Sequence, residues 1–162
     1  MGLELEHSLR RWAEQALEGM GIDKNKIPNF EELQNKAMDG LRATYSEEVL
    51  AFSLEPKNLR SIPNPDGFAR VTGSCGDTME MYLKVEDGRI LEASFQTDGC
   101  LPSIASGSMT TELAKGKSLN EASQISQETI LNALGGLPED SAHCALLAAD
   151  TLKQAIEDFS NR

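Results

Sequence analysis

Apolar residues recur at helical spacing in the first part of the chain. Residues 3–19 predict an amphipathic helix that ends at Gly19 and Gly21. Its apolar stripe consists of Leu5, Leu9, Trp12, Ala16 and Leu17. A stripe of this kind needs an apolar surface to cover it.

Two further helices are predicted before residue 56. Asn29 and Glu32 stand in capping-box positions, so a second helix should begin at Asn29. Its expected buried stripe is Leu33, Ala37 and Leu41. Ser46 should begin a short helix that runs to about residue 54, because Pro56 disfavours helical backbone at the residue before it.

The pattern then changes from helical to alternating. Residues 56–67 are rich in Pro, Asn, Asp and Gly and predict an irregular connection. Strands are predicted at 68–72, 78–85 and 90–97, with a hairpin turn at 86–89. The second strand would point Met79, Met81 and Leu83 to one face, and the third Leu91, Ala93 and Phe95. These strands predict an antiparallel meander with helices over one face.

The remainder of the chain is predicted to be helical. Helices are expected from Pro102 to Lys115, with Gly116 as the stop, and at 118–125, 127–134 and 142–159. The expected apolar stripe of the last helix is Ala145, Leu146, Ala149, Leu152, Ile156 and Phe159. The fold class is therefore α+β, with an extra helical segment at the N-terminal side.

Composition narrows the function classes. The chain has 162 residues, enough for one domain, and a formal net charge of −11. That charge argues against nucleic-acid binding, which needs clustered Lys and Arg. No apolar run approaches a membrane span, and the first residues resemble neither a signal peptide nor a myristoylation site. We therefore expect a cytoplasmic protein without a membrane partner.

The three cysteines carry the most informative chemistry. Cys75 is followed by Asp77, Cys100 precedes a predicted helix, and Cys144 follows His143. An odd number of cysteines favours free thiols in a reducing compartment over a disulfide framework. Buried structural cysteines are the ordinary alternative. Here the neighbouring Gly, Asp and His residues favour exposed thiols with thiolate character, as a soft metal or an iron–sulfur cluster requires.

The predicted elements would bring these residues together. Cys75 and Asp77 are two residues apart at the start of a strand, so their side chains should project to the same side. The positive end of the following helix dipole favours the thiolate form of Cys100. His143 and Cys144 can address one metal only because they lie at a helix start. No orienting residue for Cys–His catalysis and no paired Cys-x-x-Cys zinc knuckles are found.

Residues 45–162 resemble the IscU/NifU-type iron–sulfur cluster assembly scaffolds. The matching stretches are Tyr45-Ser46-Glu47-Glu48-Val49, Pro56-Lys57-Asn58, Cys75-Gly76-Asp77, residues 97–106, Lys115-Gly116-Lys117-Ser118-Leu119, Leu137-Pro138, His143-Cys144-Ala145 and Leu147-Ala148. The resemblance implies a three-stranded antiparallel sheet packed by helices. It implies a domain at 45–162 and leaves residues 1–44 as an N-terminal helical extension.

The same resemblance implies a function and a set of roles. A scaffold builds a labile [2Fe–2S] cluster from ferrous iron and the sulfur of a cysteine desulfurase, and passes it to apo iron–sulfur client proteins; an iron donor is a further implied partner. Such a protein is a carrier and not an enzyme. The implied ligands for the cluster, iron or zinc are Cys75, Asp77, Cys100, His143 and Cys144. Cys144 is the implied persulfide acceptor, and the hard carboxylate of Asp77 would keep the cluster labile.

Three features depart from the family pattern. Ser141 stands where many members have Lys, after Glu139 and Asp140, which weakens the case for release by a dedicated Hsp70 chaperone. Residues 1–44 have no counterpart in the minimal scaffold. These 162 residues show no counterpart of the additional modules of the longer nitrogen-fixation proteins, so we expect a single-site scaffold. The extension could pack on the sheet, mediate dimerisation or shield the site, and the favoured interpretation is extra helices that cover apolar surface. His7 within it is predicted to be a surface residue.

Two other functions compete with the scaffold. A zinc-dependent sulfur-transfer protein would relay persulfide through one thiol, but that branch usually lacks a histidine beside the final cysteine and has a longer insertion before it. An interaction module with a structural metal would unfold without it. His143 and the short stretch between Cys100 and His143 favour the scaffold.

Overall fold

A three-stranded antiparallel sheet forms the centre of the fold. In the computed structural model, which describes residues 2–27 and 29–162, the strands are β1 (Gly67–Thr72), β2 (Thr78–Glu86) and β3 (Arg89–Thr97), in that spatial order. The predicted α+β meander is confirmed. Among these described residues no helix has the length and apolar character needed to cross a bilayer.

One face of the sheet is buried. Met79, Met81 and Leu83 of β2 are fully buried, as their alternation predicted. The prediction for β3 was wrong at Leu91, which is 65% exposed, whereas Ile90 is fully buried. The reason is a β-bulge: Lys84 pairs with Glu92 but Val85 pairs with Ile90, so Leu91 has no partner and turns outward.

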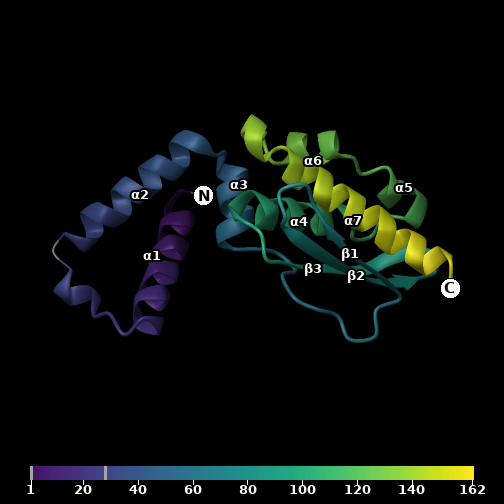
Figure 1. The fold of residues 1–162 in the computed structure, drawn as a ribbon, viewed down its shortest axis with the longest axis horizontal. Coiled ribbons are helices and arrows are strands. Elements are labelled where there is room, and N and C mark those ends of the chain that lie inside the picture. Colours follow the sequence, from purple (N-terminus) through teal and green to yellow (C-terminus); the bar gives the residue numbers. More distant parts are fainter. Residues whose placement is uncertain (1, 28) are drawn as a thin grey trace.

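Two long helices cover the buried face. Helix α7 (His143–Ser160) packs along β1 and β2, and α4 (Leu101–Ala114) packs along β3 and against α7 (Figure 1). The short helices α5 (Leu119–Ser123) and α6 (Gln127–Ala133) contact α7 from the other side. Because α7 meets both the sheet and these helices, it buries Leu147, Ala148 and Ala155 beyond the predicted stripe, while the predicted Leu146 is 45% exposed.

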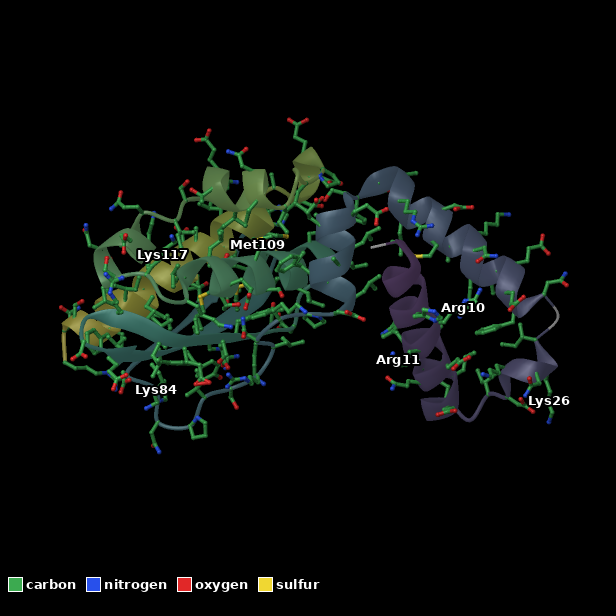
Figure 2. The ribbon with its side chains drawn as sticks, turned by 180° about the vertical axis from the view of Figure 1, so that it is seen from behind. Arg10, Arg11, Lys26, Lys84, Met109 and Lys117 are labelled. Carbon is green, nitrogen blue, oxygen red and sulfur yellow. The ribbon has the colours of Figure 1, made fainter. Side chains whose placement is uncertain are left out.

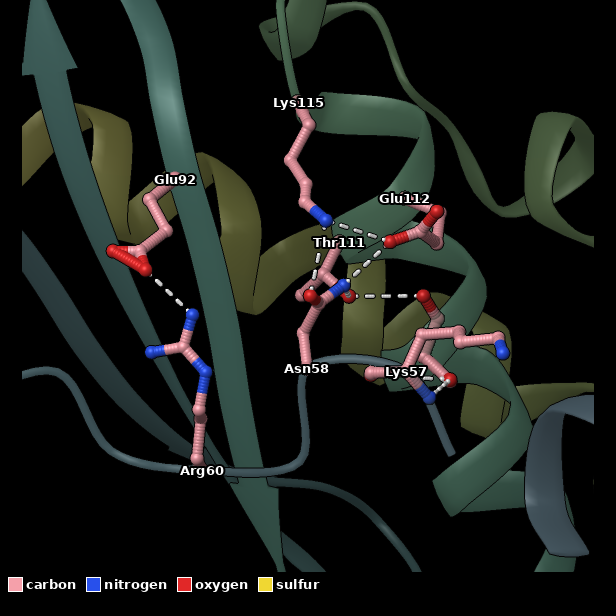
Figure 3. Close-up of polar contacts among 8 residues, drawn as sticks. Lys57, Asn58, Arg60, Glu92, Thr111, Glu112 and Lys115 are labelled. Atoms are coloured by element: carbon pink, nitrogen blue, oxygen red, sulfur yellow. Dashed lines mark hydrogen bonds and ion pairs between the residues drawn. The ribbon is translucent and has the colours of Figure 1, made fainter. Parts of the chain in front are cut away.

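The connection after α3 (Glu47–Leu54) is irregular but firmly held. Asn58, with φ +62°, donates from Nδ2 to Thr111 Oγ1 at 3.0 Å and to Glu112 Oε1 at 2.8 Å (Figure 3). Lys115 Nζ donates to Asn58 Oδ1 at 3.0 Å. Leu59 forms a parallel bridge beside β3. The predicted connection is therefore fixed between α4 and the edge of the sheet.

The extension forms a helical hairpin beside the domain. Helix α1 (Gly2–Gly19), the 3-10 turn η1 (Lys24–Lys26) and α2 (Phe30–Thr44) project away from the sheet, and both helices pack chiefly against α3 (Figure 1). Figure 2 shows Arg10 and Arg11 on α1 and Lys26 at the far end of the hairpin. Of the possibilities raised for the extension, packing on the sheet is therefore wrong.

The apolar stripes of the hairpin are largely uncovered. Trp12 and Leu33 are 62% and 60% exposed, and they line an open groove of about 330 Å³ between α1 and α2. The side chains of Leu5 and Leu9 lie outside the described residues. In α2 the buried residues are Gln34 and Met38, so the predicted stripe was wrong at Leu33 and Ala37, whereas Leu41 is half-buried and packs against the Met38–Leu50 cluster. Asn29 occupies the N-cap position but makes no side-chain cap, having φ +60°.

Candidate metal centre

Three predicted ligands meet at one end of the sheet. Asp77 lies between β1 and β2, Cys100 directly precedes α4, and Cys144 is in the first turn of α7. One ligand atom from each residue lies within 4.8 Å of the others. Among the described residues, this converging set does not include Cys75 or His143. That these two residues bind the metal stays a prediction.

The turn between β1 and β2 positions Asp77 and leaves Cys75 at the surface. Gly73 N donates to the Asp77 carbonyl at 2.8 Å, and Gly76 adopts φ +90° between Cys75 and Asp77. The expectation that Cys75 and Asp77 share one side of a strand was wrong, because β2 begins only at Thr78. Cys75 is exposed at the tip of the turn, beside the centre and not within it.

A hydrogen-bonded loop carries Cys100 into place. Thr97 Oγ1 donates to the Thr78 carbonyl at 2.8 Å and accepts from Gly99 N at 3.1 Å. Cys100 then occupies the N-cap of α4, which begins at Leu101 and not at Pro102 as expected. The loop thus ties the start of α4 to the start of β2, which adjoins Asp77. Cys100 is exposed.

The start of α7 carries the last two candidates. Gln127 Nε2 donates to the Ala142 carbonyl at 2.9 Å, which holds the residue before α7 against α6. Within the first turn, His143 Nε2 lies 3.7 Å from Cys144 Sγ. The imidazole therefore sits at the rim of the centre, next to the innermost thiol.

Cys144 is buried, which the sequence did not predict. Its side chain is 1% exposed, and burial raises the pKa of its thiol to about 11. The contact with Ser103 Oγ lowers this pKa, and the nearby thiols of Cys100 and Cys75 raise it. The expected exposed thiolate is therefore wrong for Cys144: without a bound cation its thiol is neutral at pH 7.

Ser103 occupies the middle of the centre and was not singled out from the sequence. Its Oγ donates to Asp77 Oδ2 at 2.8 Å and lies 3.4 Å from Cys144 Sγ and 3.9 Å from Cys100 Sγ. Its side chain is fully buried. The available signal was its spacing, because a residue three positions after the N-cap faces back toward that cap.

Tyr45 is a second neighbour that sequence reasoning did not place. The pKa of its hydroxyl is raised, first by burial and then by the charges of Cys100, Asp140 and Cys144. The phenol therefore lies within electrostatic reach of the centre, from the side of α3.

The donor set is chemically distinctive. Two thiols and one carboxylate suit a borderline or soft cation such as zinc or iron, and a fourth donor is close by in the imidazole of His143. Closed structural zinc sites generally have four firmly held Cys or His ligands. Here the converging set has three members, one of which is a carboxylate, so the centre is open.

These observations define a class of protein: a small α+β domain with an open thiol–carboxylate centre at one end of its sheet. The family described as "NifU-like N terminal domain" matches residues 44–162, and the chain belongs to this family.

Relatives and a solved structure agree with this assignment. Over 116 residues the chain is 46% identical to the iron–sulfur cluster assembly scaffold protein IscU 1 of Archaeoglobus fulgidus, covering 71% of this chain and 76% of that protein. It is 42% identical over 123 residues to the IscU scaffold of Escherichia coli K12, covering 73% and 95%. The crystal structure of a NifU-like N-terminal protein from Brucella abortus superposes with a TM-score of 0.59 at 21% identity, covering 72% and 94%, and supports the fold alone.

Proposed function

We propose that residues 45–162 act as an iron–sulfur cluster assembly scaffold. The domain would receive ferrous iron and desulfurase-derived sulfur, hold a transient [2Fe–2S] cluster, and release it to apo-proteins. It would do so as a carrier and not as an enzyme. The same centre would accept zinc when iron is scarce.

The meeting of Asp77, Cys100 and Cys144 carries this proposal. Thiolates bind iron strongly, whereas a carboxylate is a harder and less covalent ligand, so a mixed set favours release. Relatives at 42% and 46% identity are named as cluster assembly scaffolds. His143 and the exposed Cys75 are the proposed supplementary ligands, one at the rim and one on the adjacent turn.

Cys144 is the proposed acceptor of sulfur. Its thiolate would attack the outer sulfur of the desulfurase persulfide; that S–S bond would break, and the desulfurase thiolate would leave. Because the thiol is buried with a raised pKa, this step requires the first turn of α7 to open and a base to take the proton. The imidazole of His143, 3.7 Å away, is the proposed base.

Anaerobic reconstitution tests the scaffold function. The protein is incubated with ferrous iron, cysteine, a thiol reductant and a cysteine desulfurase, and then with an apo-ferredoxin. We expect a [2Fe–2S] visible absorption and circular dichroism spectrum that moves to the ferredoxin. Persulfide delivery with tightly held zinc and no cluster would instead identify a sulfur-transfer protein.

Mass spectrometry after the desulfurase reaction tests the sulfur acceptor. We expect the added sulfur on Cys144 in the wild type and in Cys75→Ser, and its loss in Cys144→Ser. Added sulfur on the exposed Cys75 or Cys100 would reverse the assignment.

A further inference from the structure

We infer that Ser103 is a positioning residue that holds the Asp77 carboxylate in the metal centre and thereby sets the affinity of the site for its cation. This inference rests on the proposed function, because it concerns the same centre. Ser103 has no ligating role in it. It would act through Asp77 and not by binding the cation itself.

The hydrogen bonds of Ser103 single it out. Its hydroxyl proton is directed to Asp77 Oδ2 at 2.8 Å, a distance typical of a bond to a carboxylate. The same oxygen lies within 3.4 Å and 3.9 Å of the thiols of Cys144 and Cys100. Among the described residues, Ser103 is thus bonded to or in polar contact with every member of the converging set.

Burial makes this bond decisive for the orientation of Asp77. Ser103 is fully buried and sits on the first turn of α4, which packs against both β3 and α7. Asp77 lies in the turn before β2, so sheet pairing does not fix its side chain, and its carboxylate accepts the hydrogen bond from Ser103. Residues that hydrogen-bond to metal ligands generally fix the orientation of those ligands. Losing one such residue typically lowers metal affinity about 10- to 100-fold.

Gly99 provides independent support for the pairing. A Cβ at Gly99 would lie 2.5 Å from Asp77 Oδ2 and 2.6 Å from Ser103 Oγ, far inside contact distance. The backbone of residue 99 therefore passes directly over the Asp77–Ser103 hydrogen bond, and only glycine leaves room for it. Gly99→Ala should separate the two side chains without removing either.

Ser106 offers a matched control on the same helix. It is also a fully buried serine of α4, but its Oγ has no hydrogen-bond partner among the described residues. Ser106→Ala removes the same atom from the same helix three residues further on. It should leave metal binding unchanged.

The test measures Zn²⁺ affinity by competition with a chromophoric chelator, and Co²⁺ spectra, on the full chain. Folding of each variant is checked by circular dichroism. We expect Ser103→Ala and Gly99→Ala to weaken Zn²⁺ binding about 10-fold or more, with a shift of the Co²⁺ d–d bands but retained thiolate charge-transfer absorption. Ser103→Thr, which keeps the hydroxyl, should restore affinity relative to Ser103→Ala.

A double-mutant cycle isolates the route through Asp77. In an Asp77→Ala background, Ser103→Ala should have no further effect on Zn²⁺ affinity, because the carboxylate that it positions is gone. Additive losses, or wild-type affinity in Ser103→Ala, would overturn the inference. If Asp77→Ala itself left Zn²⁺ affinity unchanged, the proposed donor set would fail instead, and the two failures are thus distinguishable.

Discussion

The ring of Phe95 lies directly against the backbone of Gly107. A Cβ at residue 107 would be 2.4 Å from Phe95 Cδ2, and Phe95 is fully buried. This contact lets α4 approach β3 closely enough to bury its many small residues. The position of α4 over the sheet, and therefore of Cys100 at its start, depends on it.

Gly107→Ala should destabilise the domain. Inserting a methyl group into a packed core forces neighbouring side chains off their preferred rotamers, at a cost of about 1–3 kcal/mol. We expect a lower midpoint of urea unfolding with an unchanged m-value. A stability equal to the wild type would show that α4 can shift without cost.

Gly40→Ala is the matched control for that prediction. Gly40 is also in a helix, but nothing lies within 4 Å of the Cβ that would be added. Because alanine favours helix over glycine, we expect a gain of about 0.5–1 kcal/mol. A loss at both positions would mean that contact with Phe95 is not the cause.

The three thiols should react at very different rates. Cys75 and Cys100 are exposed, whereas Cys144 is 1% exposed with a pKa raised to about 11. At pH 8, iodoacetamide should modify the first two rapidly and Cys144 slowly, as read by peptide mass spectrometry. In urea the three rates should converge. Equal rates in the folded protein would contradict the buried, protonated state.

The same pKa predicts a pH dependence of stability and of metal binding. The folded-state pKa of Cys144 lies above its ordinary value of 9.0, so this group's stabilising contribution is present below pH 9 and lost as pH rises towards about 11. Zn²⁺ must displace the proton, so affinity should rise up to about 10-fold per pH unit from this thiol. Cys144→Ser should remove the part of the pH dependence of Zn²⁺ affinity that this thiol contributes.

The strands were predictable because one-sided burial imposes a simple alternation. Met79, Met81 and Leu83 follow it without interruption, and all are fully buried. Leu91 does not follow this alternation. The β-bulge opposite Val85 depends on how the strands pair, and the sequence of β3 alone does not reveal it. A helical stripe likewise gives no information on whether a partner covers it, and Leu33 is exposed.

The site was predictable in its location more than in its chemistry. A turn and two helix starts lie at one end of the sheet, so the approach of Asp77, Cys100 and Cys144 follows from topology. The burial of Cys144 depends on how α7 packs, and the place of Ser103 depends on the close approach of Gly99. The burial of Cys144 is not visible in residue types or spacing, and the spacing of Ser103 from Cys100 indicates only that it faces back toward the start of the helix.

Asp77→Ala should make a bound cluster more persistent and slow its transfer to apo-ferredoxin. Without the carboxylate, the iron position would be open to the softer donors His143 or Cys75, which bind iron more covalently. Transfer rates followed by circular dichroism check this. Asp98→Asn is the control, because it removes a nearby charge while keeping an acceptor for Thr78 N, and it should transfer normally. Unchanged transfer in Asp77→Ala would rule out the role.

Deleting residues 1–41 should leave a folded domain that binds zinc as the full chain does. All candidate ligands lie later, and the deleted helices pack chiefly on α3. The deletion removes Met38, which is buried against Leu50, so stability should fall by on the order of 2 kcal/mol. Met38→Ala in the full chain separates this packing loss from loss of the hairpin. A truncated protein that is folded but no longer binds zinc would show that the hairpin contributes to the centre, and residues 1–44 would then have to be counted as part of the scaffold.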